Sequence, residues 1–387
     1  MKRKVLVMAS TFARWKDDTL PPFVYELSKK LTSTFDIIVL APSYPASKDF
    51  ETMDNMKVYR FHYFFKKYEK LAGSGGILPT LKKNKWYYFQ VPFFLMGEFF
   101  ALRKRIKEDN PDIIHAHWIL PQGLIAYLNY KISRKKVGYV VTSHGSDIMG
   151  LKGFLFLKKA ILKNAKKINV ASNAIKKEIL ENIDSSLTIE VIPMGIDTDL
   201  FNEDKKDISL KKKNKIDGPF LLYVGRIAPE KGIDLLIEAM PEVINKFPEV
   251  KLMIIGEGTI KEEIVNRVDE LNIKNKIIFM GWVDNKKLPK YYATADVFVC
   301  PSRREGSPVS YIESLACGTP LVVGDIPISN EIIKNKEMGL VVKHNPEDVS
   351  KGIISVISMK NKKRFNSEIK KNYDHKVIVK KFEEVLR

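Results

Sequence analysis

The sequence is poor in cysteine and has no long apolar run. Cys300 and Cys317 are the only cysteines in 387 residues, which excludes a framework of disulfide bonds and fits a reducing compartment. No apolar run approaches the length of a membrane-spanning helix. The N-terminal MKRKVLVMAS is basic and then apolar, but its apolar part of about five residues is too short for a secretion signal. We therefore expect a cytoplasmic protein without a spanning segment.

Acidic residues are in the minority, and the deficit is uneven along the chain. The formal net charge is +19, and residues 1–200 contain 32 Lys and Arg against 19 Asp and Glu, a net +13. A basic excess indicates an anionic partner, either a membrane surface or nucleic acid, although lysine-rich composition is also a habit of whole genomes. Because no aromatic signature of RNA-binding domains occurs, we expect no nucleic acid as a partner.

The region 57–107 favours the membrane. It interleaves aromatic residues with lysine, as in KVYRFHYFFKKYEK and LKKNKWYYFQVPFF, and this composition is typical of surfaces that meet lipid headgroups. We expect peripheral binding to the inner face of the membrane through Lys66, Lys67, Lys82, Lys83 and Lys85, with insertion of Phe64, Phe65, Trp86 or Tyr87. The alternative is a core helix at 89–107 that packs Phe93, Phe94, Met96, Phe99, Phe100 and Leu102.

Strands and helices alternate along the chain, which predicts an α/β protein. In the first part we expect helices at 20–33 and 122–134 and strands at 4–10, 35–42, 111–118, 167–172 and 189–197, with a strand followed by a glycine loop at 138–147. The polar stretch 205–219 lacks apolar periodicity, as connections between domains do. Six apolar strands follow it: FLLYVG, VKLMIIG, KIIFMG, VFVCPS, PLVVG and GLVVK. The expected division is a domain at 1–200, a linker at 201–219, a domain at 220–366 and a helical segment at 367–387.

Two glutamates stand eight positions apart in PSRREGSPVSYIESLACGTP (301–320). A strand ends there and a helix begins near Pro308, so Glu305 lies at the mouth of the helix and Glu313 about one turn further in. Free N–H groups at a helix N-terminus bind anions, and carboxylates beside an anion suit sugar hydroxyls. The pattern predicts a nucleotide sugar, with Glu313 at the ribose and Glu305 at the hexose. The alternative is a pair of ordinary glutamates favoured by the helix dipole.

A second segment, FLLYVGRIAPEKGIDLLIEAM (220–240), adds two cations in a loop between a strand and a helix. Such loops gather at the carboxyl ends of parallel strands, where ligands bind. Arg226 offers a planar fork of donors and Lys231 a point charge, which together suit a diphosphate. Without a metal ion, these cations would have to stabilise the leaving diphosphate themselves. The alternative is a solvated pair at a loop edge.

These segments resemble the retaining glycosyltransferases of family 4, also called glycosyl transferases group 1. The resemblance rests on VGR with APEKG (224–232), IIGEG (254–258), GWV (281–283), ADVFVCPS (295–302), Glu305 with Glu313, and ACGTP (316–320). Each motif is weak alone, but their order and spacing are specific. The resemblance implies the GT-B fold, in which two Rossmann-like doubly wound domains face each other across a cleft and a C-terminal helix crosses back to the N-terminal domain.

The resemblance also implies roles for individual residues. Arg226 and Lys231 would hold the diphosphate and, with Glu305 and His144, form the catalytic group. Val283 would lie beside the base. The implied donor-binding set is Arg226, Lys231, Gly256, Val283, Glu305, Gly306, Ser307, Pro308, Val309, Ser310 and Glu313.

The acceptor side is expected in the N-terminal domain. His144, in TSHGSD, would face the transferred sugar, and His117 and Trp118, at the end of another strand, would line the acceptor site. His115 lies on the same strand face as His117, and both histidines are either buried or in the cleft. Many relatives have a glycine-rich loop after the first strand, whereas this chain has STFARWKDDTLPPF (10–23) with no glycine. Trp15 could stack on a sugar face there, and Asp17 could bind an acceptor hydroxyl or act as a base.

We therefore expect a metal-independent, retaining hexosyltransferase without a cofactor, which uses a nucleotide diphosphate sugar and a glycan or lipid-linked acceptor. The DxD string of Asp197 and Asp199 would chelate a metal in other transferases, but here it follows a strand of a different architecture and is interpreted as structural. The alternatives are a sugar-nucleotide epimerase or a phosphorylase on the same fold, and a nucleic-acid-binding protein.

Overall fold

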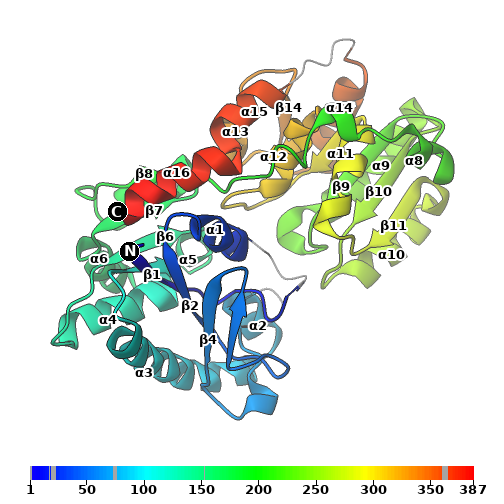
Figure 1. Cartoon of the computed structure of the whole chain (residues 1–387). Helices are drawn as coiled ribbons and strands as arrows, with labels where there is room; N and C mark the ends of the chain where they lie inside the picture. Colours follow the sequence, from blue (N-terminus) through cyan, green and yellow to red (C-terminus); the bar gives the residue numbers. More distant parts are fainter. Residues whose placement is uncertain (1, 17, 19–22, 73–75, 152, 360–364) are drawn as a thin grey trace. The chain divides into compact units, whose positions relative to one another are not determined.

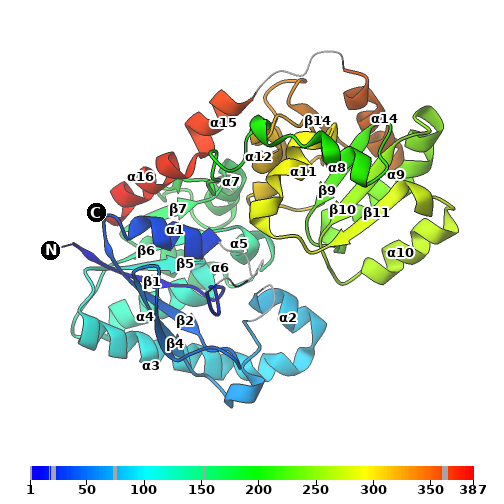
Figure 2. The same cartoon turned by 45° about the vertical axis from the view of Figure 1, so that its right-hand side comes forward.

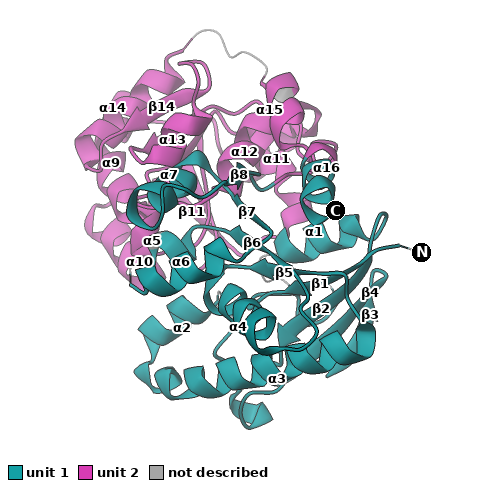
Figure 3. Cartoon of the chain, turned by 90° about the vertical axis from the view of Figure 1, so that its left-hand side faces the viewer, with its two compact units in different colours: residues 1–194, 378–387 teal, residues 195–377 magenta. Residues whose placement is uncertain are grey.

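The computed structural model describes residues 2–16, 18, 23–72, 76–151, 153–359 and 365–387. The chain forms two compact units, one of residues 1–194 with 378–387 and one of residues 195–377 (Figure 3). Within the described residues, no helix is long and apolar enough to cross a membrane.

Unit 1 is built on an eight-stranded sheet in the order β3-β4-β2-β1-β5-β6-β7-β8 (Figure 1). All neighbouring strands are parallel except β3 and β4. The strands are β1 (Lys4–Met8), β2 (Asp36–Pro42), β3 (Phe50–Met53), β4 (Met56–Phe61), β5 (Ile113–His117), β6 (Tyr139–Ser143), β7 (Lys167–Val170) and β8 (Glu190–Val191). The helices are α1 (Phe23–Leu31), α2 (Ile77–Lys83), α3 (Val91–Asp109), α4 (Leu124–Ile132), α5 (Ser146–Met149), α6 (Leu155–Lys163) and α7 (Asn173–Asn182).

Both faces of this sheet are covered, because successive side chains of a strand point to opposite faces. In β1, Val5 and Val7 pack with α1, whereas Leu6 and Met8 belong to the core under α3, α4, α6 and α7. Figure 2 shows α1 on one side of the sheet and α3 and α4 on the other. A parallel sheet that is buried on both faces requires nearly continuous apolar strands, as the sequence KVLVM provides.

The C-terminal helix returns to unit 1. The boundary between the units falls inside α16 (His375–Leu386), whose residues from Ile378 on belong to unit 1. Phe382 is completely buried against the α1 side of the sheet, with its ring 5.7 Å from that of His115. The expected crossing of the last helix to the N-terminal domain is confirmed.

Unit 2 contains a fully parallel six-stranded sheet in the order β11-β10-β9-β12-β13-β14. Its strands are β9 (Phe220–Val224), β10 (Lys251–Ile255), β11 (Ile277–Gly281), β12 (Val297–Cys300), β13 (Leu321–Gly324) and β14 (Gly339–Val342). Its helices are α8 (Ile208–Lys213), α9 (Ile233–Lys246), α10 (Lys261–Glu270), α11 (Pro289–Thr294), α12 (Val309–Ala316), α13 (Pro327–Ile332), α14 (Pro346–Ile357) and α15 (Asn366–Tyr373).

The division of the chain differs from the expected one at the linker. Residues 195–219 belong to unit 2, and Leu210 and Ile216 are buried in its core. The stretch lacks a visible period because α8 has only six residues and buries one of them, Leu210. The expected strand at 189–197 is also shorter, since β8 ends at Val191 and Ile196 bridges to Asp374 instead.

We predict that Phe382→Ala lowers the free energy of unfolding by about 3–5 kcal/mol, because it removes a large side chain and leaves a cavity. Lys381→Ala, at the exposed neighbouring position, is the matched control and should change it by less than about 0.5 kcal/mol. Denaturant unfolding followed by circular dichroism measures both. Equal values for the two variants would contradict the docking of α16 on unit 1.

Candidate functional site

The strand order of unit 2 creates a switch point between β9 and β12. From β9 the chain proceeds in one direction to β10 and β11, and from β12 in the other to β13 and β14. Ligands of open parallel sheets bind outside the carboxyl ends of the strands at such a point. The loop after β9 carries Arg226 and Lys231, and the loop after β12 carries Glu305. The fold therefore brings these predicted residues to one place.

Lys231 and Glu305 form a largely buried ion pair. The Lys231 ammonium lies 2.5 Å from Glu305 Oε1, and the same oxygen accepts a hydrogen bond from Ser302 Oγ at 2.9 Å. Burial alone would lower the pKa of Lys231, but the charge of Glu305 and the neighbouring Cys300 raise it above its ordinary value. The ammonium is therefore favoured in its charged form, and Glu305 is its one described ion-pair partner.

Arg226 is the more accessible cation, with 54% of its side chain exposed and Nη2 held at 2.6 Å from Glu230 Oε1. Its carbonyl accepts a hydrogen bond from the Tyr223 hydroxyl at 2.6 Å. The loop is fixed to the one after β12, because Arg303 donates to the Pro229 carbonyl and pairs with Asp234. The sequence patterns did not predict Glu230, Ser302 and Arg303 as residues of the site. The only sequence signal for them is their position in the loops after β9 and β12.

Glycines let these loops approach each other closely. At Gly232, with φ of +67°, a Cβ would lie 2.1 Å from the Pro301 carbonyl oxygen. At Gly256, after β10, a Cβ would lie 1.9 Å from the carbonyl oxygen of Gly225. Gly256 therefore has a packing role next to the loop of Arg226, and its expected contact with a donor remains a prediction.

Helix α12 begins where the sequence predicts. Its first residue is Val309, and Pro308 precedes it without a side-chain cap. Gly306, Ser307, Val309 and Ser310 are partly exposed there. The start of the helix thus offers backbone N–H groups without a capping side chain, as an anion site requires.

Glu313 lies in the second turn of α12 and is buried. The Tyr292 hydroxyl donates to its Oε2 at 3.0 Å. Burial raises the pKa of Glu313 to about 7, against the smaller opposite effect of the Tyr292 hydrogen bond. A carboxyl with such a pKa changes charge near neutral pH. No sequence signal marked Tyr292 as its partner.

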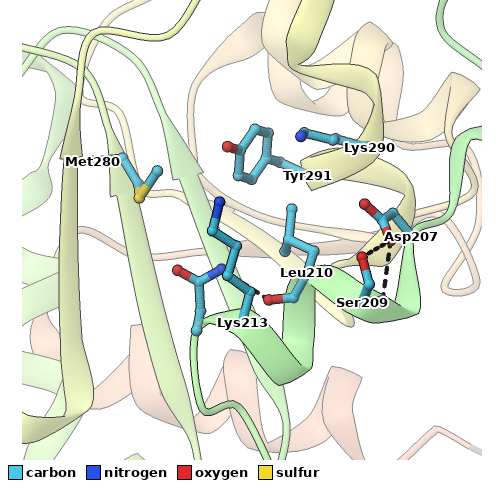
Figure 4. A pocket seen from close by; sticks show the side chains of 8 residues that line it. Asp207, Ser209, Leu210, Lys213, Met280, Lys290 and Tyr291 are labelled. Carbon is cyan, nitrogen blue, oxygen red and sulfur yellow. Dashed lines mark hydrogen bonds between the residues drawn. The ribbon is translucent and has the colours of Figure 1, made fainter.

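Val283, just after β11, is partly buried against the core of unit 2. A separate surface pocket lies between α8, α11 and Met280 of β11, with Lys213 and Lys290 at its rim (Figure 4). None of the predicted site residues lines this pocket, and its lining supports no functional assignment.

Unit 1 has its own switch point, between β1 and β5. Trp118 follows β5, and His144 follows the next strand, β6. The His144 ring contacts the rings of Phe23 and Trp118, with centroids 4.8 and 5.0 Å away. The loops are joined by Asp147, which accepts hydrogen bonds from the Ile119 N–H at 2.6 Å and Ser143 Oγ at 2.8 Å. His144 and Trp118 are partly exposed, as binding residues must be.

His115 and His117 are both completely buried. His115 Nε2 lies 2.7 Å from Thr142 Oγ1, and His117 Nδ1 lies 2.9 Å from His144 Nε2. Burial lowers the pKa of His115 and of His144 to about 3 and that of His117 well below its ordinary value, so all three rings are neutral. A direct contact of His117 with an acceptor, as we expected, is not compatible with its burial.

The loop after β1 is described up to Lys16 and at Asp18, so the predicted Asp17 lies outside the described residues. Trp15 is exposed, and its ring lies beside Tyr44. Arg14 stacks on both rings and forms a bidentate ion pair with Asp18 at 2.7 and 2.8 Å. The described part of this loop therefore presents the Trp15 ring beside Tyr44.

The DxD string makes local contacts. Asp197 Oδ1 accepts hydrogen bonds from the N–H groups of Asp199 and Leu200 at 3.1 Å, and Asp199 pairs with Lys376. These contacts agree with a structural role. Among the described residues, no three His, Cys, Asp or Glu side chains are grouped as metal ligands.

Two family profiles match the chain. Glycosyltransferase Family 4 matches residues 22–200, and Glycosyl transferases group 1 matches residues 204–374. An uncharacterized glycosyltransferase of Methanocaldococcus jannaschii is 27% identical over 95% of this chain and 94% of its own length. A GDP-mannose-dependent alpha-(1-6)-phosphatidylinositol monomannoside mannosyltransferase of Mycolicibacterium smegmatis is 26% identical over 62% of this chain and 65% of its own.

Solved structures show the same fold. Sucrose-phosphate synthase from Thermosynechococcus elongatus superposes with a TM-score of 0.80 over 99% of this chain and 98% of its own, at 18% identity. Anabaena HepE in complex with UDP and glucose gives 0.71 over 99% of both chains, at 16% identity. With both halves matched by the two profiles, the chain is a GT-B-fold glycosyltransferase of the family 4 type.

Proposed function

We propose that this glycosyltransferase is a retaining, metal-independent enzyme that moves a hexose from a nucleotide diphosphate sugar to a glycan or lipid-linked acceptor. It would act at the inner face of the membrane, in the synthesis of cell-surface polysaccharide or glycolipid. The observation that carries the proposal is the Lys231–Glu305 pair at the β9/β12 switch point, beside Arg226 and the uncapped start of α12. The named activities of the relatives support it, since one transfers mannose to a phosphoinositide glycolipid.

In this proposal, unit 2 holds the donor. Lys231 and Arg226 stabilise the negative charge that develops on the leaving diphosphate, and the N–H groups at the start of α12 add further donors. Glu305 binds hydroxyls of the hexose, and Glu313 binds hydroxyls of the ribose. The fixed Lys231–Glu305 contact positions cation and carboxylate before the donor arrives, so little reorganisation is needed in the transition state.

Unit 1 would supply the acceptor side. Neutral His144 is partly exposed as a residue, and its Nδ1 is a buried atom without a partner among the described residues, so a hydrogen bond with a sugar hydroxyl would satisfy it. Trp118 and Trp15 offer partly exposed aromatic faces, on which sugar rings pack.

A thermal-shift screen of nucleoside diphosphates and their sugars tests the donor class, because a ligand of the native state raises its stability by mass action. The stabilising donor is then incubated with acceptor glycans or lipids in excess chelator. Transfer with retained anomeric configuration supports the proposal. Loss of activity with chelator would contradict metal independence. Formation of an epimer would indicate an epimerase instead, and a requirement for phosphate would indicate a phosphorylase.

We predict that Lys231→Ala and Arg226→Ala each lower the rate of transfer by roughly 30- to 1,000-fold, which corresponds to about 2–4 kcal/mol of transition-state stabilisation. Each loses a charged contact with the diphosphate. Lys261→Ala and Arg267→Ala remove ion-paired cations elsewhere in unit 2 and serve as matched controls with wild-type turnover. Unchanged turnover in both site variants would reject the diphosphate assignment.

The raised pKa of Glu313 predicts pH-dependent donor binding. Free Glu313 is protonated below about pH 7. If its anionic form accepts ribose hydrogen bonds, binding lowers its pKa and releases a proton, so affinity for the nucleotide sugar should rise about tenfold between pH 6 and pH 8. Calorimetric titration at several pH values measures this, with Glu313→Gln as the pH-independent control. Affinity that falls with pH in the wild type would contradict a ribose-binding carboxylate.

The membrane part of the proposal rests on the solvent face of α3. Phe94 and Leu102 are 1% and 0% exposed, as a core helix requires, but Phe93, Met96 and Phe100 are 40%, 56% and 61% exposed. The latter three recur at helical spacing on one side of α3. The alternative of a fully packed helix is therefore wrong for these three residues, which form an outward apolar stripe.

Aromatic contacts extend this stripe beyond α3. The Phe93 ring lies 5.4 Å from that of Phe89 and 5.8 Å from that of Phe64, which in turn contacts Trp86 at 5.9 Å. Exposed cations flank the aromatic surface, and they are Lys67, Lys70, Lys82, Lys83, Lys85, Arg103, Lys104 and Lys107. Lys66 contributes less, because it pairs with Asp49 at 2.9 Å. Apolar insertion flanked by cations fits an anionic bilayer.

We predict that wild-type protein sediments with anionic vesicles and far less with neutral ones. Lys82→Gln, Lys83→Gln and Lys85→Gln together should weaken binding at low salt by at least about tenfold, because each cation near an anionic surface contributes up to about 1 kcal/mol. Met96→Ser with Phe100→Ser should remove the salt-resistant part.

The matched controls for the vesicle assay change the same residue types elsewhere. Lys246→Gln with Lys286→Gln and Lys287→Gln removes three exposed lysines of unit 2, and Ile132→Ser with Ile208→Ser removes side chains 61% and 66% exposed. Both controls should bind as wild type. Equal pelleting with both lipids, or a dimer in analytical ultracentrifugation that Met96→Ser with Phe100→Ser abolishes, would reject the membrane model.

A further inference from the structure

His117 and His144 form an imidazole pair at the carboxyl ends of β5 and β6. His117 Nδ1 and His144 Nε2 are 2.9 Å apart. The ring planes differ by only 4°, while the ring centroids are 5.2 Å apart. Because the two nitrogens are much closer than the centroids, the rings lie edge to edge, and the bond runs along the line between them. This is favourable geometry for a hydrogen bond.

The bond fixes the orientation of His144. Its Nε2 faces His117, so its Nδ1 lies on the other side of the ring, where it is buried and has no partner among the described residues. His117 is itself immobilised, since it is completely buried and its ring lies 4.2 Å from that of His115. His115 is held in turn by Thr142 Oγ1 at 2.7 Å, and Thr142 by Asn169 at 2.9 Å.

The pair also constrains the proton of His144. Burial keeps both rings neutral by lowering their pKa values, so each carries one N–H. One of the two facing nitrogens must donate and the other must accept. The state of His117 therefore decides whether His144 Nδ1 offers a hydrogen or a lone pair to a ligand.

We propose that His117 is a positioning residue, which holds the ring of His144 and sets its tautomer so that His144 Nδ1 meets a sugar hydroxyl in a defined role. This deepens the proposed function and rests on it for the identity of the ligand. His117 touches neither donor nor acceptor. Its effect on transfer passes through the single bond to His144.

Isosteric substitutions separate this role from mere packing. In His117→Asn, an amide atom bonded to Cγ occupies nearly the place of Nδ1, so the contact with His144 is kept. In His117→Gln the amide lies further out, near the place of Nε2, and the contact is lost. His117→Leu fills space without any polar atom. If His117 acts only by packing, kcat should follow the volume of the substituted side chain. If His117 positions His144, only His117→Asn should retain kcat.

We expect His117→Leu and His117→Gln to lower kcat by at least about tenfold, with the KM for the donor within about twofold of wild type. His117→Asn should retain kcat within about threefold. Thermal unfolding of each variant is followed in parallel. A kcat that tracks the loss of stability across the three variants, or equal losses in Asn and Gln, would overturn the proposal.

A second readout needs neither donor nor acceptor. In protein labelled with ¹⁵N-histidine, the ring nitrogens of His144, assigned by loss of its signals in His144→Gln among the six histidines, report which nitrogen carries the proton. We expect one tautomer in wild type and in His117→Asn, and a mixture in His117→Leu. Identical His144 shifts in all variants would overturn the positioning role. Absence of transfer by wild type with every donor would instead reject the proposed function and leave this result standing.

Discussion

The arrangement of the candidate site in unit 2 depends on one ion pair across a switch point. Lys231 and Glu305 are 74 residues apart in the sequence, and they meet only because β9 and β12 are neighbours whose carboxyl ends open on the same edge. An ion pair with so little exposure is costly to form unless its geometry is good and its remaining donors and acceptors are used. Ser302 donates to the same Glu305 oxygen that Lys231 contacts, and in the proposed function a diphosphate would be a further partner of Lys231. These contacts offset the cost of burying two charged side chains in a region otherwise lined by buried strands.

The close approach of the surrounding loops follows from the same constraint. Gly232 and Gly256 lie where the backbones of neighbouring loops leave no space for a Cβ. Arg303 ties the two loops together through the Pro229 carbonyl and Asp234. These contacts of Arg303 therefore join the loops after β9 and β12. They limit the conformations open to the loop that carries Arg226. Rigid loops on a parallel sheet are a suitable support for electrostatic stabilisation, which depends on groups that are in place before the charge develops.

Unit 1 shows how burial assigns different roles to similar residues. His115, His117 and His144 all stand in or directly after a strand. Only His144 is partly exposed, and the other two are buried in the core. On α3, Phe94 and Leu102 belong to the core, while Phe93, Met96 and Phe100 face outward. The hydrophobic effect favours burial of all of them, so the three exposed side chains form an apolar surface that the described residues leave uncovered.

The sequence alone determined the strands of both sheets other than β3 and β4, the loops of Arg226 and Lys231, and the start of α12 near Pro308, because apolar runs, turn residues and helix starts are local signals. It also determined the family, since the motifs keep their order. Tertiary structure alone decided which residues meet: Tyr292 with Glu313, Arg303 with Asp234, and His117 with His144. It decided as well that residues 205–219 belong to unit 2. The sequence shows no helical periodicity of apolar residues there, because α8 has six residues and buries only Leu210. Contacts and burial depend on strand order and packing across long separations, and no local pattern encodes them.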